Sequence, residues 1–477
     1  MKLKVFASAI IVALLSFSAS AANYLISPSA TTNGAAIAYK NVQFKVGTTA
    51  FSSFSAFVAA NPAANSTVYV ASGTYSENVT ISTAGLNFVG ANAFGDSRTS
   101  TRTLAESIIT GKLTVNANNV TINGFRFTGN GCVVNSAATV SSPLSGLKFI
   151  YNKVDGSTLA HNLSTAVLHL GTPRTNDAAI DASVHCIYQN ITVSHNEFKG
   201  SASNTAHFVV VAGGFGTCYY TDNTFDDGGC SIALYNTQGT NYIRYNTFKN
   251  VGDFTRASGS DYGEFAIRLF YIAYANTTKI HIDYNDFDNC QGQSSMYSCI
   301  RFYNGDTSHT IMTPVGCTIN VHHNIFRNKP KHSSANYNYV FYTNYTEAAT
   351  IYARLNTFDN SELCFGFIKQ KGESSAKRLF ASSAGLFDVG TAKSSIAYHK
   401  YQGGSTDFKN MKTKCTRVCQ NFDLDNNGTI YTCQICDDLA TSLGIHKNSL
   451  MVTHFYTDSE TGEIKKSYMY LQHAGHG

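Results

Sequence analysis

A strand-like segment followed by Asn, any residue and Phe recurs through the middle of the chain, and this repeat limits the possible folds more than any other feature. The asparagines are Asn152, Asn196, Asn223, Asn246, Asn285, Asn324 and Asn356, with Val154 in place of the first Phe. Successive asparagines lie 23 to 44 residues apart. Repeats built from helices keep a nearly fixed period, whereas the coils of a solenoid accept loops of varying length.

A second strand-like segment follows most of these asparagines. Its copies are residues 167–171, 208–213, 231–236, 265–271, 298–304 and 364–369. Both kinds of segment alternate apolar and polar residues, which predicts strands buried on one side. Stacked coils would bury the apolar positions in one column, with each Asn amide bonded to the Asn of the next coil and Phe filling the interior.

The repeat resembles that of the right-handed parallel β-helix of the pectate-lyase-like superfamily, over roughly residues 65 to 390. Residues 53–81, with a helix-like stretch before TVYVASGTY, are similar to the capping first coil of such proteins. The resemblance implies an all-β fold: a right-handed parallel β-helix solenoid, followed here by a small Cys-containing C-terminal module. Members of this superfamily include polysaccharide lyases, glycoside hydrolases, tail spikes and surface adhesins.

The first residues predict export. Lys2 and Lys4 precede an apolar run from Val5 to Phe17, and small residues suited to cleavage end at Ala21. A membrane anchor is the alternative, but about 13 apolar residues are too few for the roughly 20 that span a bilayer. We therefore expect a signal peptide at 1–21, a β-helix with its cap at 22–399, a Cys-rich module at 400–477, and a secreted or cell-surface protein without a membrane span.

The charge argues against a nucleic-acid partner. Without Lys2 and Lys4, the 35 basic side chains fall to 33 against 30 acidic ones, a formal charge of +3. Charged residues make up only 14% of the chain and Trp is absent. Electrostatic recognition must then come from a local cluster.

One such cluster is predicted on the second strand of each coil. Alternation places His169, Arg268 and Arg301 in one outward column, with Arg268 and Arg301 about 4.8 Å apart on adjacent coils. Two guanidinium groups at this spacing repel unless they share an anion, such as the carboxylates or sulfates of an acidic polysaccharide. The next outward positions would offer aromatic faces to sugar rings: Tyr235, Phe270 and Tyr303. The alternative is that nearby acids neutralise the arginines: Glu264, Asp261, Asp253 or Asp306.

The resemblance to polysaccharide lyases implies β-elimination at this column. Arg268 or Arg301 would be the base, and calcium would be held by Glu264, Asp261 or Asp306, with Lys369 as a further substrate-binding residue. No family-specific motif surrounds these residues, and an Arg base needs its pKa lowered substantially. Hydrolysis would need two carboxylates, and Asp226-Asp227 is the one acidic doublet in the coils.

The twelve cysteines fall into two groups. Eight are scattered through the coils, where Cys290 could form a disulfide with Cys299 or Cys317. Four cluster in the tail, at Cys415, Cys419, Cys433 and Cys436. The tail group could bind zinc, but export favours two disulfides.

The tail also carries the first half of a calcium loop. Asp423, Asp425 and Asn427 occupy the first three ligand positions and Gly428 follows, but Gln434 stands where an acid is usual. A polar β-turn is the alternative. The final stretch predicts a hairpin around Glu460-Thr461-Gly462.

Two functions from different classes follow. The first is a secreted protein that binds, and by the resemblance cleaves, an acidic polysaccharide. The second is a non-catalytic surface adhesin, in which the β-helix is a rigid spacer and the tail attaches it to the cell surface.

Overall fold

The computed structural model describes residues 21–96, 102–155, 166–172, 186–200, 207–252, 265–272, 278–291, 298–304, 317–329, 339–344, 349–354 and 356–359, and then the strand segments 364–368, 377–379, 385–389, 392–397, 400–402, 422–423, 430–431, 451–457 and 464–470. The predicted signal peptide lies outside these residues.

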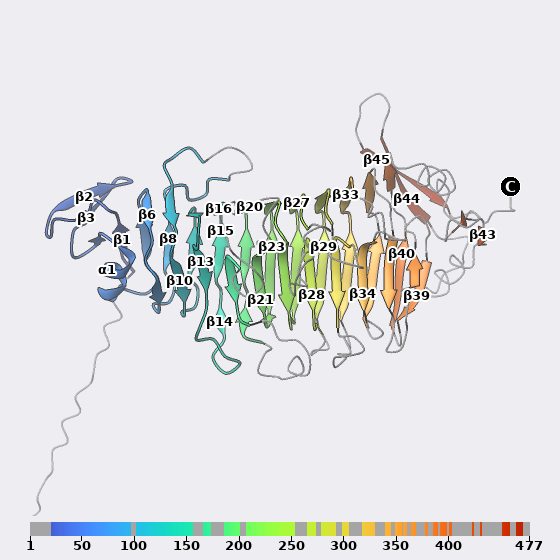
Figure 1. Cartoon of the computed structure of the whole chain (residues 1–477), viewed down its shortest axis with the longest axis horizontal. Coiled ribbons are helices and arrows are strands. Elements are labelled where there is room, and N and C mark those ends of the chain that lie inside the picture. Colours follow the sequence, from blue (N-terminus) through green and yellow to red (C-terminus); the bar gives the residue numbers. More distant parts are fainter. Residues whose placement is uncertain are drawn as a thin grey trace, which may run out of the picture.

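Three long sheets run side by side along the molecule, and they are almost entirely parallel (Figure 1). Sheet I consists of β7 (Val79–Ile81), β10 (Lys112–Val115), β13 (Cys132–Val134), β17 (Leu168–Leu170), β21 (His207–Ala212), β25 (Cys230–Tyr235), β28 (Ile267–Phe270), β31 (Ile300–Tyr303), β34 (Tyr339–Asn344), β37 (Cys364–Ile368) and β38 (Lys377–Leu379).

Sheet II consists of β4 (Ala50–Phe51), β1 (Asn23–Ile26), β5 (Thr67–Val70), β8 (Asn87–Val89), β11 (Thr121–Asn123), β15 (Lys148–Ile150), β19 (Thr192–Ser194), β23 (Thr217–Thr221), β26 (Thr240–Arg244), β29 (Lys279–Asp283), β32 (Thr318–His322), β35 (Thr350–Arg354), β40 (Ala392–Ala397) and β39 (Gly385–Val389). Sheet III consists of β6 (Gly73–Tyr75), β9 (Ser107–Ile109), β12 (Arg126–Phe127), β16 (Lys153–Asp155), β20 (Glu197–Lys199), β24 (Thr224–Asp226), β27 (Thr247–Lys249), β30 (Asp286–Asp288), β33 (Ile325–Arg327), β36 (Thr357–Asp359) and β41 (Lys400–Gln402).

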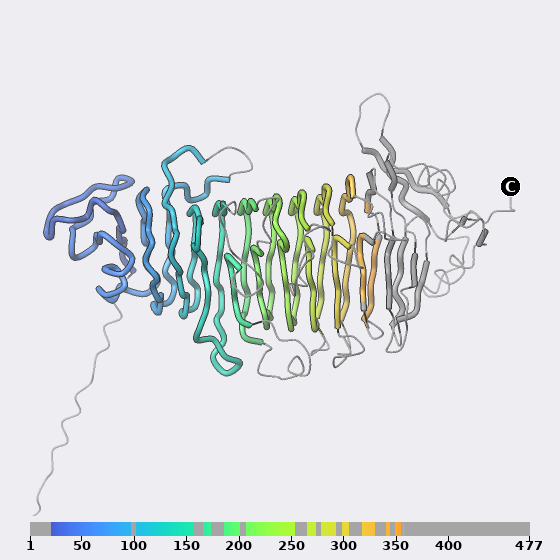
Figure 2. Tube along the Cα trace, in the orientation of Figure 1, coloured from blue at the N-terminus to red at the C-terminus, as the bar shows by residue number. Residues whose placement is uncertain are grey.

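Each coil contributes one strand to each sheet in turn, so the chain is a parallel β-helix. In one coil, β21 of sheet I is followed by β23 of sheet II and β24 of sheet III, and β25 then returns to sheet I beside β21. The trace in Figure 2 shows these coils stacked along the long axis. The predicted fold class is therefore confirmed.

The repeat asparagines form a buried ladder at the turn between sheets II and III. The Nδ2 of Asn223 donates to Oδ1 of Asn246 at 3.0 Å, and Asn246 donates in the same way to Asn285. Each amide also donates to a backbone carbonyl, as Asn285 does to Ile243 at 2.8 Å. These asparagines are at most 1% exposed. Because buried amides must be hydrogen-bonded, the ladder explains why Asn recurs at this position.

The Phe of each repeat stacks on the Phe of the next coil beneath this ladder. The ring centroids of Phe225 and Phe248 lie 5.1 Å apart and the two rings are nearly parallel. Those of Phe248 and Phe287 lie 4.8 Å apart. All three side chains are buried. The predicted roles of Asn and Phe are thus both confirmed.

The residue before each repeat asparagine from Asn152 to Asn324 adopts a left-handed backbone conformation. Tyr245 and Tyr284 both have φ of 57°, and His323 has φ of 54°. Non-glycine residues rarely adopt this conformation, and here it lets the chain turn sharply while the Asn points inward.

A short helix closes the N-terminal end of the core. Helix α1 (Phe54–Ala59) begins at Ser53, whose hydroxyl accepts a hydrogen bond from Ala56 N at 3.1 Å. Phe54 and Phe57 are buried against Phe88 of the first coils. The hairpin of β2 (Ala36–Tyr39) and β3 (Val42–Lys45) lies at the same end (Figure 1). This arrangement confirms the predicted cap.

The tail contains two antiparallel strand pairs. Strands β44 (Met451–Thr457) and β45 (Ile464–Tyr470) pair from Thr457 opposite Ile464, which confirms the predicted hairpin. The shorter pair is β42 (Phe422–Asp423) and β43 (Ile430–Tyr431). The four tail cysteines, Asp425 and Asn427 lie outside the described residues, and Asp423 is described only as backbone.

The predicted disulfide between Cys290 and either Cys299 or Cys317 is wrong, because all three are free thiols. The Sγ of Cys299 donates to the carbonyl of Cys290 at 3.4 Å, and the Sγ of Cys290 donates to that of Phe248 at 3.3 Å. In the apolar core these cysteines act as small hydrophobic side chains.

Candidate functional site

The arginine column of sheet I has the predicted register. Arg268 on β28 is the direct partner of Arg301 on β31, and Phe270 is the partner of Tyr303. Upstream, His169 continues the same column through Val210 and Ala233. The sequence pattern therefore assigned these side chains to the correct face of each strand.

Both guanidinium groups are nevertheless buried. Arg268 is 3% exposed and Arg301 is 4% exposed. The guanidinium carbon of Arg268 lies 3.9 Å from the ring centroid of Phe270, and that of Arg301 lies 4.4 Å from the ring of Tyr342. Each positive charge thus rests on an aromatic face, which partly replaces water as its partner.

Burial lowers the pKa of Arg301 to about 10, although the nearby Tyr342 hydroxyl acts to raise it. At pH 7 only about one guanidinium in a thousand would then be neutral. A base needs its neutral form, so this pKa is poorly suited to proton abstraction near neutrality.

The aromatic residues predicted to contact sugars form a small buried cluster on the outer side of sheet I. Tyr235 and Phe270 are buried with ring centroids 5.7 Å apart, and Tyr303 is half-buried against Phe270 at 4.8 Å. His169 is half-buried. The other residues predicted for this site lie outside the described residues: Lys369, Glu264, Asp261, Asp253 and Asp306.

A buried histidine adjoins the arginine column. His207, at the start of β21, is 1% exposed, and neither ring nitrogen has a hydrogen-bond partner. Burial, followed by the charge of Arg268, lowers the pKa of His207 to about 3. The ring is therefore neutral at any pH near 7.

The sequence reasoning missed a second surface, on sheet II and the adjoining Asn turn. Two rows of stacked rings, with three rings in each row, cross the coils there. In each row the centroids of the first and second rings lie 5.3 Å apart, and those of the second and third rings lie 4.9 Å apart. The rows are Tyr219, Tyr242 and His281 on the strands, and Tyr245, Tyr284 and His323 at the turn. We call these six residues the aromatic face.

Three of the four tyrosines of the aromatic face are exposed, and Tyr242 is half-buried. Tyr245 is 50% exposed, Tyr284 is 46% and Tyr219 is 42%. Because the rings stack on one another, they present their edges and hydroxyl groups outward. The sequence signal was the recurrence of Tyr or His immediately before the repeat Asn.

Charged side chains occupy the outward position between the two rows. Arg244, Asp283 and His322 are register partners on β26, β29 and β32. Asp283 Oδ2 lies 3.0 Å from Arg244 Nη2 and 3.4 Å from His322 Nε2. His281 precedes Asp283 by two residues and so points to the same side of β29. Burial raises the pKa of Asp283, against the opposing effect of Arg244.

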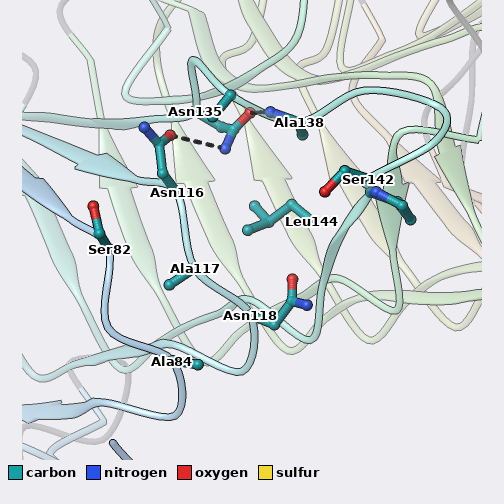
Figure 3. A pocket seen from close by; sticks show the side chains of 11 residues that line it. Ser82, Ala84, Asn116, Ala117, Asn118, Asn135, Ala138, Ser142 and Leu144 are labelled. Carbon is teal, nitrogen blue, oxygen red and sulfur yellow. Dashed lines mark hydrogen bonds between the residues drawn. The ribbon is translucent and has the colours of Figure 1, made fainter. Parts of the chain in front are cut away.

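A polar pocket of about 230 Å³ lies further toward the N-terminus, beside β14 (Leu144–Ser145). Its wall includes Asn116 and Asn135, and Asn135 Nδ2 donates to Asn116 Oδ1 at 3.1 Å (Figure 3). The Oδ1 of Asn135 in turn accepts from Ala138 N. The remaining lining residues carry no charge: Ser82, Ala84, Ala117, Asn118, Ala137, Ser142, Pro143 and Leu144. Because Asn116 and Asn135 already hydrogen-bond to each other and the lining carries no positive charge, the pocket has few groups that could bind an anionic ligand.

The fold and these surfaces define a parallel β-helix protein. No protein-family model and no curated protein sequence matches the chain. Among solved structures, the chain is similar to PfbA, a surface adhesin of Streptococcus pneumoniae, with 11% sequence identity and a TM-score of 0.38, over 71% of this chain and 92% of that one. Within the part of the chain that the structure describes, no helix is long and apolar enough to cross a membrane.

Proposed function

We propose that this protein is a non-catalytic, exported adhesin-type protein that binds an acidic polysaccharide along its aromatic face. The observation that carries the proposal is the row of exposed, stacked tyrosines Tyr245 and Tyr284, continued by His323. Exposed aromatic groups that gather on one face of a soluble protein mark interaction sites. A row repeated once per coil suits a ligand that is itself a repeating polymer.

The charge on this face favours an anionic polymer. Asp283 is buried, whereas the Arg244 side chain is 27% exposed. Lys279, on the same strand as Asp283, is also exposed. Of these three charged groups, the two that are accessible are positive. Arginine and lysine on a surface of this kind attract carboxylates and sulfates.

The buried arginines of sheet I support binding without cleavage. A polysaccharide chain must reach the base that removes its proton, and Arg268 and Arg301 are at most 4% exposed. Lyase activity at these two residues, and a calcium ion beside them, remain predictions from the resemblance to the pectate-lyase-like superfamily.

The experiment is a binding assay of the full-length chain on immobilised acidic and neutral polysaccharides. We expect Tyr245→Ala with Tyr284→Ala to weaken binding about tenfold or more, and Leu104→Ala, which removes a 57% exposed apolar side chain elsewhere, to leave it unchanged. Equal binding by the double variant would overturn the proposed face.

Cleavage is read in the same samples from the absorbance of the unsaturated uronate that β-elimination produces. We expect no such product with calcium present. A product that disappears in Arg301→Lys would instead establish the lyase and its base.

A further inference from the structure

We propose that His281, Asp283 and His322 form a binding site for a divalent transition metal ion of the zinc type. Each residue offers one ligand atom, and these atoms lie within 4.8 Å of one another. Imidazole nitrogens and a carboxylate oxygen are ligands that zinc prefers, and three protein ligands leave a fourth position open for water or a bound group. The proposal does not depend on polysaccharide binding.

The parallel register brings the three ligands together. His281 and Asp283 stand two residues apart on β29, so their side chains leave the same face of sheet II. Asp283 is the direct partner of His322 on the next coil. A third ligand from an adjacent strand thus completes the set without any loop.

The carboxylate of Asp283 supplies independent evidence for a missing partner. Asp283 is only 3% exposed, and its Oδ2 accepts from Arg244. Its buried Oδ1 has no hydrogen-bond partner. Oδ2 is the oxygen that lies near His322 Nε2. A buried carboxylate oxygen without a partner is costly, and a metal ion held by both oxygens of Asp283 would supply the missing interaction.

The surrounding side chains orient both imidazoles as metal sites require. The Nδ1 atoms of His322 and His323 lie 2.9 Å apart in a hydrogen bond, which leaves Nε2 of His322 facing Asp283. Tyr242 stacks on His281 with ring centroids 4.9 Å apart. Such outer contacts commonly hold ligating histidines in place.

Two features weaken the site without removing it. Ligand atoms around a tetrahedral zinc lie ~3.4 Å apart, and those here lie within 4.8 Å of one another. Side-chain rotation must therefore bring the widest pair together by up to about 1.4 Å. Arg244 also places a positive charge beside the ion. Removing that charge should strengthen metal binding, whereas the arginine would have no such effect if the cluster were only an ion-pair network.

The test is cobalt titration of the full-length chain, purified without a histidine tag and followed by visible absorption. Cobalt on the tail cysteines gives a thiolate charge-transfer band, whereas cobalt on His and Asp gives only the weaker d–d bands, so the two sites are read separately. We expect the wild type to bind one equivalent of cobalt at the His/Asp site. The affinity of this site should fall at least about 100-fold, or binding should be lost, in His281→Gln, Asp283→Asn and His322→Gln. Arg244→Gln should strengthen it roughly fivefold.

His195→Gln serves as the matched control, since His195 stacks on Tyr151 at the same kind of turn and belongs to no predicted site. Circular dichroism checks that each variant is folded, and Asp283→Asn keeps the side-chain shape if a histidine variant does not fold. A wild type without the d–d bands, or bands that persist in Asp283→Asn, would overturn the proposal.

Discussion

Asn246 and Asn285 lie 39 residues apart in the chain and are joined by two hydrogen bonds. The Oδ1 of Asn285 accepts from both the backbone N–H and the side-chain amide of Asn246, each at 3.0 Å. The side-chain amide of Asn285 bonds in turn to Asn324 and to the carbonyl of Ile243. The coils from Asn152 to Asn356 are thus each tied to the next at the same point, in a place that water cannot reach.

Asn285→Ala should therefore destabilise the protein by about 3 kcal/mol, because it leaves several buried donors and a carbonyl without partners. Asn78→Ala is the matched control, since its exposed side chain accepts a hydrogen bond from Lys112 N of the neighbouring coil at 2.8 Å and its backbone is not left-handed. The midpoint of urea unfolding, followed by circular dichroism, measures both. Equal midpoints for the two variants would show that the ladder contributes little.

His207 should make the protein less stable in acid. Its pKa in the folded state is about 3, below the ordinary value of 6.5, because burial and Arg268 disfavour the charged ring. The folded protein then binds fewer protons than the unfolded chain, so this contribution is complete above pH 6.5 and is lost as the pH falls toward 3. The loss is up to about 1.4 kcal/mol per pH unit.

His207→Gln lacks this titration, so the difference in unfolding free energy between wild type and variant should shrink as the pH falls from 7 to 4. Denaturant unfolding at several pH values gives both curves. Curves that stay parallel would mean that His207 takes up its proton in the folded protein as it does in the unfolded chain.

Charges alternate along one outward column of sheet III. The register partners in order are Asp155, Lys199, Asp226, Lys249, Asp288 and Arg327. Lys249→Glu would place three acids in succession and should destabilise the protein by about 1 kcal/mol at low salt, with Lys249→Gln intermediate. Thermal unfolding at low and at 1 M salt checks this, since salt at about that concentration screens such charges. An effect of Lys249→Glu that is unchanged by salt would point to packing rather than charge.

The core cysteines should resist alkylation. Burial raises the pKa of Cys317 to about 12 and that of Cys299 to about 11, so neither forms the reactive thiolate near pH 8. Among the seven cysteines whose side chains the structure describes, half-buried Cys132 and Cys186 should react first. Mass spectrometry after timed iodoacetamide treatment of the folded protein gives the order. Rapid labelling of Cys317 would indicate that this part of the core opens.

The sequence was sufficient to predict the parallel coils, the Asn and Phe positions and the facing of Arg268 and Arg301. These features depend on strict local rules: strand side chains alternate, and a buried amide needs a partner at the same place in every coil. The spacing of the repeat therefore specified which residues become neighbours along each sheet, even across intervals of 23 to 44 residues.

Only the tertiary structure decided which of these faces is accessible and which side chains meet on it. Alternation distinguishes inward from outward, but the burial of Arg268 and Arg301 depends on how Phe270 and Tyr342 pack against them in three dimensions. The approach of His322 to Asp283 likewise requires that the chain, 39 residues further on, returns in register with the previous coil. A sequence pattern describes the alternation of side chains along one strand. The exposure of a side chain, and the side chains it contacts, depend on how several strands and their side chains pack together.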